Sequence, residues 1–144
     1  MSIEFVEPDN TYIDYNIAAI QVDDWNGKGG NKTEGFTFLD LYNQARLVKE
    51  EAVETYDAAK TLKDIDSGIL TLENLETLKD EGYDPLVEVL DGAMDSVVVL
   101  FRFISMLEIM GYDTNKAWTR VMDSLDSKIM ENLTQEELTY AKEN

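Results

Sequence analysis

The chain has 144 residues, of which 44% are hydrophobic and 10% aromatic, enough for one compact domain with a core. Thirty acidic against twelve basic residues give a net charge of -18, which argues against binding to nucleic acid or to anionic membrane surfaces. Because cysteine and histidine are absent, disulfides, iron–sulfur clusters, thiolate or imidazole metal sites and Ser/His/Asp catalysis are excluded.

The N-terminal segment, residues 1–35, shows only a weak helical pattern, from Ile13 to Trp25. The stretch Gly27–Lys32 that follows is rich in glycine and asparagine and predicts a flexible loop. The first ten residues lack a basic region followed by an apolar run, so we expect no signal peptide and a cytoplasmic protein. We expect this segment to belong to the same domain as residues 36–144.

The first long helix is predicted from Thr37, as N-cap, to about Lys60, because apolar residues recur there at steps of three and four. A short connecting helix is expected from Thr71 to about Lys79, before Gly82.

The second long helix is predicted to begin at Asp84-Pro85 and to end at Gly111. Its segment Val97–Phe101 is also compatible with a buried strand, but the length of the uninterrupted run favours a helix. The apolar stretch contains Arg102 and is too short to span a bilayer, which needs roughly 20 residues.

Two further helices are expected near the C-terminus. Thr114 is predicted to cap a helix to about Ile129, and Thr134 with Glu137 forms a capping-box pattern for a short helix to Lys142. The fold class is therefore all-α: a helical bundle built on two long helices that pack antiparallel.

Two pairs of carboxylates interrupt apolar helix faces: Glu51 with Glu54, and Asp91 with Asp95. Each pair lies on one side of its helix, because residues three or four apart are neighbours on a helix surface. Burying such charges without a cation is costly, so a bound cation is indicated. Oxygen ligands alone favour Mg²⁺ or Mn²⁺, and Mg²⁺ commonly completes its shell with substrate phosphates. The alternative is that these acids simply form a solvent-exposed edge of each helix.

The order of these motifs also resembles a known family. The sequence ARLVKEEAVE at 45–54, EVLDGAMD at 88–95 and GYD at 111–113 are similar to the all-α nucleoside triphosphate pyrophosphohydrolases, the MazG-like group, and most to short phage-encoded members. The resemblance covers about residues 36–130. It implies cleavage of a nucleoside triphosphate to a monophosphate and pyrophosphate with Mg²⁺, in the host cytoplasm if the protein is phage-encoded.

Within this resemblance, Glu51, Glu54, Asp91 and Asp95 are the metal ligands, and Glu50 is a candidate water-orienting base. Glu88 with Asp91 is an alternative register of the second pair. Gly92 stands where the family usually has Glu.

The resemblance extends to substrate binding. Lys128 lies in a segment similar to one that helps hold the nucleotide in the family, although Leu125 replaces its usual Asn. Arg102 is either a phosphate contact or a partner of the acids. Trp25, Phe36 and Phe38 could stack a base, although core positions are more usual for such aromatics.

Three other functions stay open: hydrolysis of phosphoribosyl-ATP, an acidic DNA-mimicking inhibitor, and a catalytically dead scaffold. The second long helix is apolar on nearly all sides, so other helices must pack against each of them. We therefore expect a homodimer or a dimer of dimers.

Overall fold

The structure, a computed structural model, describes residues 13–131, 137, 139 and 140. Within these ranges it contains the α-helices α1 to α5 and no strand. The chain divides into two compact units: one extends to Met110 and contains α1–α4, and the other begins at Gly111 and contains α5. Each unit is described by itself. The all-α class is confirmed; the predicted boundary after residue 35 stays a prediction.

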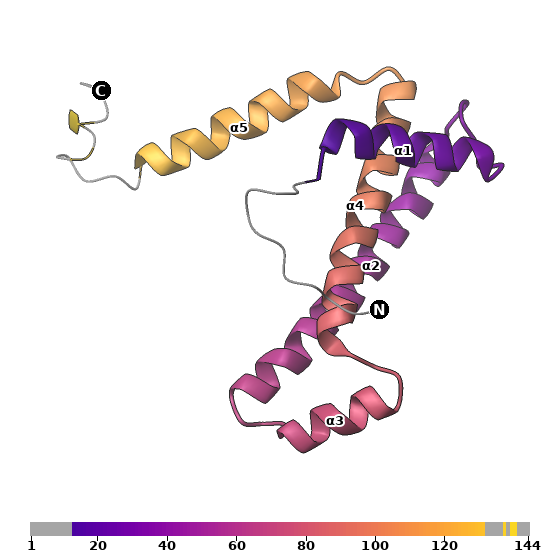
Figure 1. The fold of residues 1–144 in the computed structure, drawn as a ribbon. Helices are drawn as coiled ribbons and strands as arrows, with labels where there is room; N and C mark the ends of the chain where they lie inside the picture. Colours follow the sequence, from indigo (N-terminus) through magenta and orange to yellow (C-terminus); the bar gives the residue numbers. More distant parts are fainter. Residues whose placement is uncertain (1–12, 132–136, 138, 141–144) are drawn as a thin grey trace. The chain divides into compact units, whose positions relative to one another are not determined.

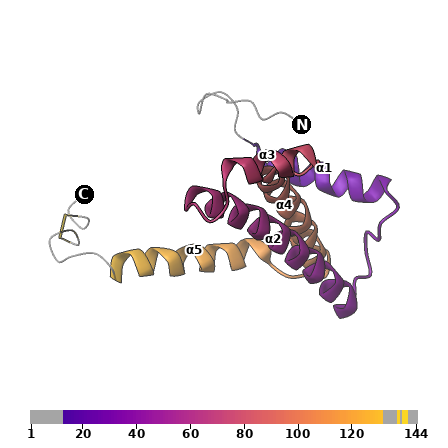
Figure 2. The ribbon, with the colours of Figure 1, turned by 90° about the horizontal axis from the view of Figure 1, so that it is seen from below.

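The two long helices, α2 (Phe38–Asp66) and α4 (Pro85–Ile109), lie side by side in both views (Figures 1 and 2). The Gln44 side-chain amide near the start of α2 donates a 2.9 Å hydrogen bond to the carbonyl of Val99 in the second half of α4. Farther along α2, Thr55 faces Gly92 in the first half of α4. The helices are therefore antiparallel, as expected.

Gly92 allows α2 and α4 to approach closely. A Cβ atom placed there would lie 3.1 Å from Cβ and 3.3 Å from Cα of Thr55, and nearer still to the Thr55 hydroxyl oxygen. The threonine is fixed in this position, because its hydroxyl donates to the Glu51 carbonyl at 2.7 Å. The glycine that departs from the family pattern thus has a packing reason.

α1 (Tyr15–Lys28) packs on α4. Its Tyr15 ring meets Phe101 edge to face, with ring centroids 6.4 Å apart, and Val22 is buried. The helix continues three residues past the predicted end at Trp25, so the glycine-rich connection begins only at Gly29. Part of the predicted loop is therefore helical.

Helix starts follow the predicted caps. Thr37 and Asp40 form a reciprocal capping box on α2, which ends at Asp66 rather than at Lys60. Thr71 caps α3 (Leu72–Asp80) in the same way, and Asp84 accepts from the amide of Leu86 at the start of α4. Short side chains with an oxygen acceptor are the ones that satisfy free amides at a helix start.

The second unit contains α5 (Thr114–Glu131). The Asp113 carboxylate accepts from the amide of Lys116 at 2.8 Å, so Asp113 is the N-cap and the prediction of Thr114 was wrong by one residue. Most of the short helix predicted for 134–142 lies outside the described residues.

Little apolar surface is buried in the described part of the chain. The buried apolar side chains are Val22, Ala58, Pro85 and Met106, whereas Phe38 is 77% exposed and Tyr56 67%. No helix there combines the length and the apolar character that a membrane span requires.

Candidate functional site

A cavity of about 480 Å³ lies where α1, the loop after it, α2 and α4 meet. Its wall combines two carboxylates, two cations, an indole ring and a set of apolar and amide side chains. The lining residues are Trp25, Asn26, Asn31, Lys32, Gln44, Leu47, Glu51, Asp95, Val98, Val99 and Arg102. We refer to it as the carboxylate cavity.

Glu51 is the most perturbed acid of this cavity. Its side chain is partly buried between α2 and α4, and its Oε2 atom is buried without a hydrogen-bond partner in the described structure. Burial raises the pKa of Glu51, and the charges of Asp95, Glu54 and Glu50 raise it further. A carboxylate in such a place is stabilised either by a proton or by a cation.

Asp95 is the acid across the helix pair from Glu51. Asp95 lies on the part of α4 that packs beside Glu51, and it lines the same cavity, although its side chain is exposed. The structure therefore brings together one member of each predicted pair. Asp91, on the preceding turn of α4, is half-buried and does not line the cavity, and Glu88 is exposed.

Glu50 and Glu54 lie on a different surface. Both are exposed and line a shallow groove along α2 together with Tyr42, Arg46 and Lys49. Glu54 is nonetheless one turn from Glu51, so its charge acts on that carboxylate.

The predicted four-carboxylate cluster does not form as such. In the described residues of a single chain, no group of three or more acidic side chains converges on a point that could hold a metal ion. Glu51 and Asp95, one acid from each of the two helices, share the cavity wall, and the charge of Asp95 acts on Glu51.

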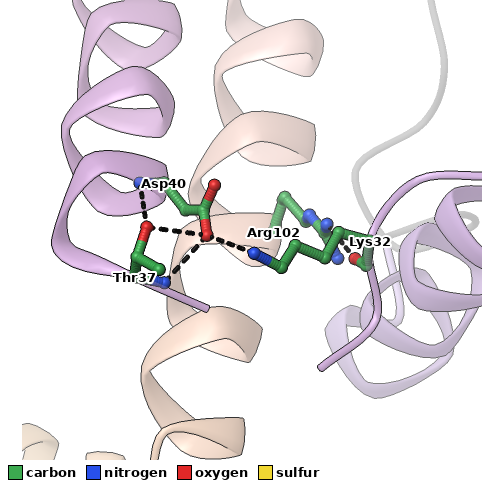
Figure 3. Close-up of polar contacts among 4 residues, drawn as sticks. All are labelled: Lys32, Thr37, Asp40 and Arg102. Atoms are coloured by element: carbon green, nitrogen blue, oxygen red, sulfur yellow. Dashed lines mark hydrogen bonds and ion pairs between the residues drawn. The ribbon is translucent and has the colours of Figure 1, made fainter. Parts of the chain in front are cut away.

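Two cations belong to the cavity wall, and a polar network holds both in place (Figure 3). The Lys32 ammonium pairs with the Asp40 carboxylate at 2.9 Å, and the Arg102 guanidinium donates to the Lys32 carbonyl. The ring of Phe36 lies 5.0 Å from the guanidinium carbon of Arg102.

Asp40 is the anchor of this network. It accepts from Lys32 and from the backbone amide and hydroxyl of Thr37, and these hydrogen bonds lower its pKa from 3.8 to about 2. Asp40, in the first turn of α2, thereby also holds the loop that contains Lys32.

Trp25 is the aromatic residue of the cavity wall. The sequence left both base stacking and a core position open for it, and its side chain is 64% exposed and lines the cavity. Asn26 and Asn31 lie beside it and are joined by a 2.9 Å hydrogen bond between their side chains. The glycine-rich run in the sequence could have indicated this part of the cavity wall, because a tight loop brings Asn31 back to the end of α1.

Lys128 lies on α5, in the second unit, and is exposed. Its predicted contact with a phosphate stays a prediction.

Comparison with family models, curated proteins and solved structures finds no match to this chain.

Proposed function

We propose that the protein is a Mg²⁺-dependent nucleoside triphosphate pyrophosphohydrolase that uses the carboxylate cavity as its active site. The observation that carries this proposal is Glu51, a carboxylate with a buried, unpartnered oxygen close to the negative charge of Asp95. Two such acids in one cavity are stabilised when a divalent cation binds between them.

The donor set fits Mg²⁺ with a bound substrate. Magnesium sites in phosphate-processing enzymes typically use one or two carboxylates, and waters and substrate phosphates supply the other ligands. Glu51 and Asp95 provide those two carboxylates. When bound, the metal ion would polarise the phosphate oxygens and lower the pKa of a coordinated water.

Lys32 and Arg102 are suited to hold the phosphates. Both line the cavity beside the two acids, and the network through Asp40 restricts their positions. Arginine has five N–H donors, so the hydrogen bond to the Lys32 carbonyl leaves others for a phosphate oxygen.

Trp25 is suited to stack against the nucleobase. Its exposed indole lies at the same cavity, and base stacking on an aromatic side chain tolerates any base.

The remaining predicted residues act farther from the two central acids. In this proposal Glu54 and Asp91 lie one turn from the two ligands on each helix, and the charge of Glu54 acts on Glu51. The charge of Glu50 likewise acts on Glu51.

The test is a panel of ribo- and deoxynucleoside triphosphates, with phosphoribosyl-ATP included, incubated with the protein and Mg²⁺ or Mn²⁺. We expect monophosphate and pyrophosphate as products, separated by chromatography. Glu51→Gln, Asp95→Asn and Glu54→Gln should each lower turnover by about 100-fold or more, because the first two remove a ligand charge and the third removes the charge that acts on Glu51.

Glu73→Gln is the matched control, since Glu73 is an exposed acid on α3, away from the cavity. Circular dichroism should show unchanged helicity for all four variants. Absence of monophosphate and pyrophosphate from every nucleotide, with either metal, would refute the proposal.

A further inference from the structure

Two asparagines beside Trp25 form a short chain of hydrogen bonds in the wall of the carboxylate cavity. The Asn26 side-chain amide donates to the carbonyl of Val22 at 2.9 Å, and the Asn31 side-chain amide donates to the Asn26 side-chain oxygen at 2.9 Å. Asn26 is buried, with 4% of its surface exposed, whereas Asn31 is exposed. The chain therefore leads from the interior to a residue that a ligand can reach.

The direction of this chain follows from its first acceptor. A backbone carbonyl can only accept, so the Nδ2 atom of Asn26 points to Val22 and its Oδ1 atom points away. That oxygen in turn requires the Nδ2 atom of Asn31. Each amide thus donates inwards, which leaves the Oδ1 atom of Asn31 as an acceptor without a partner among the described residues.

The loop after α1 holds Asn31 in this place. The backbone amide of Asn31 donates to the Asn26 carbonyl at 3.0 Å, so its main chain and its side chain both bond to Asn26. Gly30 has a φ of 76°, a left-handed conformation that glycine adopts readily, and this lets the loop turn back tightly. A side chain held in this way loses little further freedom on binding, so its oxygen is preorganised for a ligand.

We propose that Asn31 selects the base of the nucleotide, favouring a base with an amino group on its hydrogen-bonding edge, such as cytosine, over uracil. The inference rests on the proposed function, because the ligand is a nucleotide whose base stacks on Trp25. Stacking on an aromatic ring tolerates any base, so selection has to come from an edge of the base.

The free acceptor of Asn31 matches one of these two edges. Cytosine carries an amino donor at the position where uracil carries a carbonyl acceptor. The amino group satisfies the Oδ1 atom of Asn31, whereas the carbonyl would place two acceptors against each other. The ring N–H of uracil lies between two carbonyl oxygens, so it also brings an acceptor towards Asn31.

This selection belongs to the N-terminal part of the chain. Trp25, Asn26 and Asn31 all precede residue 36, outside the stretch that resembles the pyrophosphohydrolase family. The base preference therefore depends on α1 and its loop and does not follow from the resemblance.

The first experiment compares matched substrates in the presence of Mg²⁺: CTP with UTP, and dCTP with dUTP. We expect kcat/KM to be at least about tenfold higher for the cytosine member of each pair. Asn31→Ala should bring each ratio to about one. It should keep turnover of UTP, because Glu51 and Asp95 are unchanged.

Asn115→Ala is the matched control, because Asn115 is an exposed asparagine on α5, in the other unit. It should leave both ratios at their native values. Circular dichroism should show unchanged helicity for both variants.

The second experiment measures binding without hydrolysis. The chain has two tryptophans, so Trp118→Phe leaves Trp25 as the only indole, and its fluorescence reports a base that stacks on it. CMP should quench this fluorescence at concentrations about tenfold lower than UMP. Asn31→Ala in the same background should remove the difference.

The two readouts separate this inference from the hydrolase proposal. Quenching that favours CMP and depends on Asn31, with no nucleotide hydrolysed, would support the base site and refute the hydrolase. Equal kcat/KM values for CTP and UTP, or a preference that survives Asn31→Ala, overturn the role of Asn31. So does equal quenching by CMP and UMP, or no quenching by either.

Discussion

Glu51 shows how one residue can be costly to the fold and useful to a site. Its position on α2 follows from helical periodicity, which directs it towards α4 rather than to solvent. Burial and three neighbouring acids raise its pKa, so the ionised form is disfavoured in the folded chain. Such perturbed acids are concentrated at functional sites, which is why Glu51 is central to the proposed function.

At the residue scale we predict that Glu51→Gln raises the melting temperature at pH 7 in the absence of divalent cations. Because the folded pKa of Glu51 lies above its ordinary value of 4.5, ionisation at neutral pH reduces the stability of the native chain. That penalty disappears as the pH falls through the folded pKa towards 4.5.

The melting curves of the native chain and the variant should therefore converge at pH 4.5 and below. Added Mg²⁺ should stabilise the native chain and have less effect on the variant. A variant that melts below the native protein at pH 7 without metal would contradict this account of Glu51.

At the scale of elements, the α2–α4 pair depends on Gly92 in the middle of a helix. Glycine there costs about 1 kcal/mol of helix propensity relative to alanine, yet a Cβ atom would clash with Thr55. The close approach of the two helices is what brings Asp95 to the cavity that Glu51 lines.

We predict that Gly92→Ala destabilises the protein by about 1–3 kcal/mol in urea unfolding, because overpacking outweighs the gain in propensity. Gly27→Ala is the matched control: Gly27 is also helical, and a Cβ atom there would meet nothing within 4 Å. This control should raise stability by about 0.5–1 kcal/mol. Equal effects of the two substitutions would show that the α2–α4 contact does not require glycine.

At the scale of the whole molecule, exposed apolar residues far exceed buried ones among the described positions. Stabilities of single chains depend on the fraction of apolar surface removed from water, so this exposure favours the homodimer or dimer of dimers, which stays a prediction.

Much of the fold was predictable because it follows from local rules. Thr37, Thr71 and Asp84 were identified as helix caps, since a side-chain oxygen next to an apolar periodic run satisfies the free amides of a helix start. The N-cap of α5 was predicted one residue too late, at Thr114. Asp113 is an equally good acceptor, and local rules do not separate two neighbouring cap residues.

The candidate site was less predictable, because it depends on which turns of two helices meet. Periodicity identified Glu51 and Asp95 as acids on apolar faces, and both line the cavity. It could not separate Asp95 from Asp91, or show that Glu50 and Glu54 face a different groove, since neighbouring turns of one helix share the same pattern. Periodicity also left open whether Trp25 lies in a core or is exposed enough to stack a base, because exposure is a property of packing.

The sequence by itself determined the helices, their caps and the acidic character of the faces, because these depend on residues within a few positions of one another. Only the tertiary structure decided that Gly92 fits against Thr55, that Lys32 and Arg102 join the acids, and that one face of α2 is uncovered. The reason is physical: propensity and capping act along the chain, whereas burial, pKa and complementarity depend on what another element brings into contact.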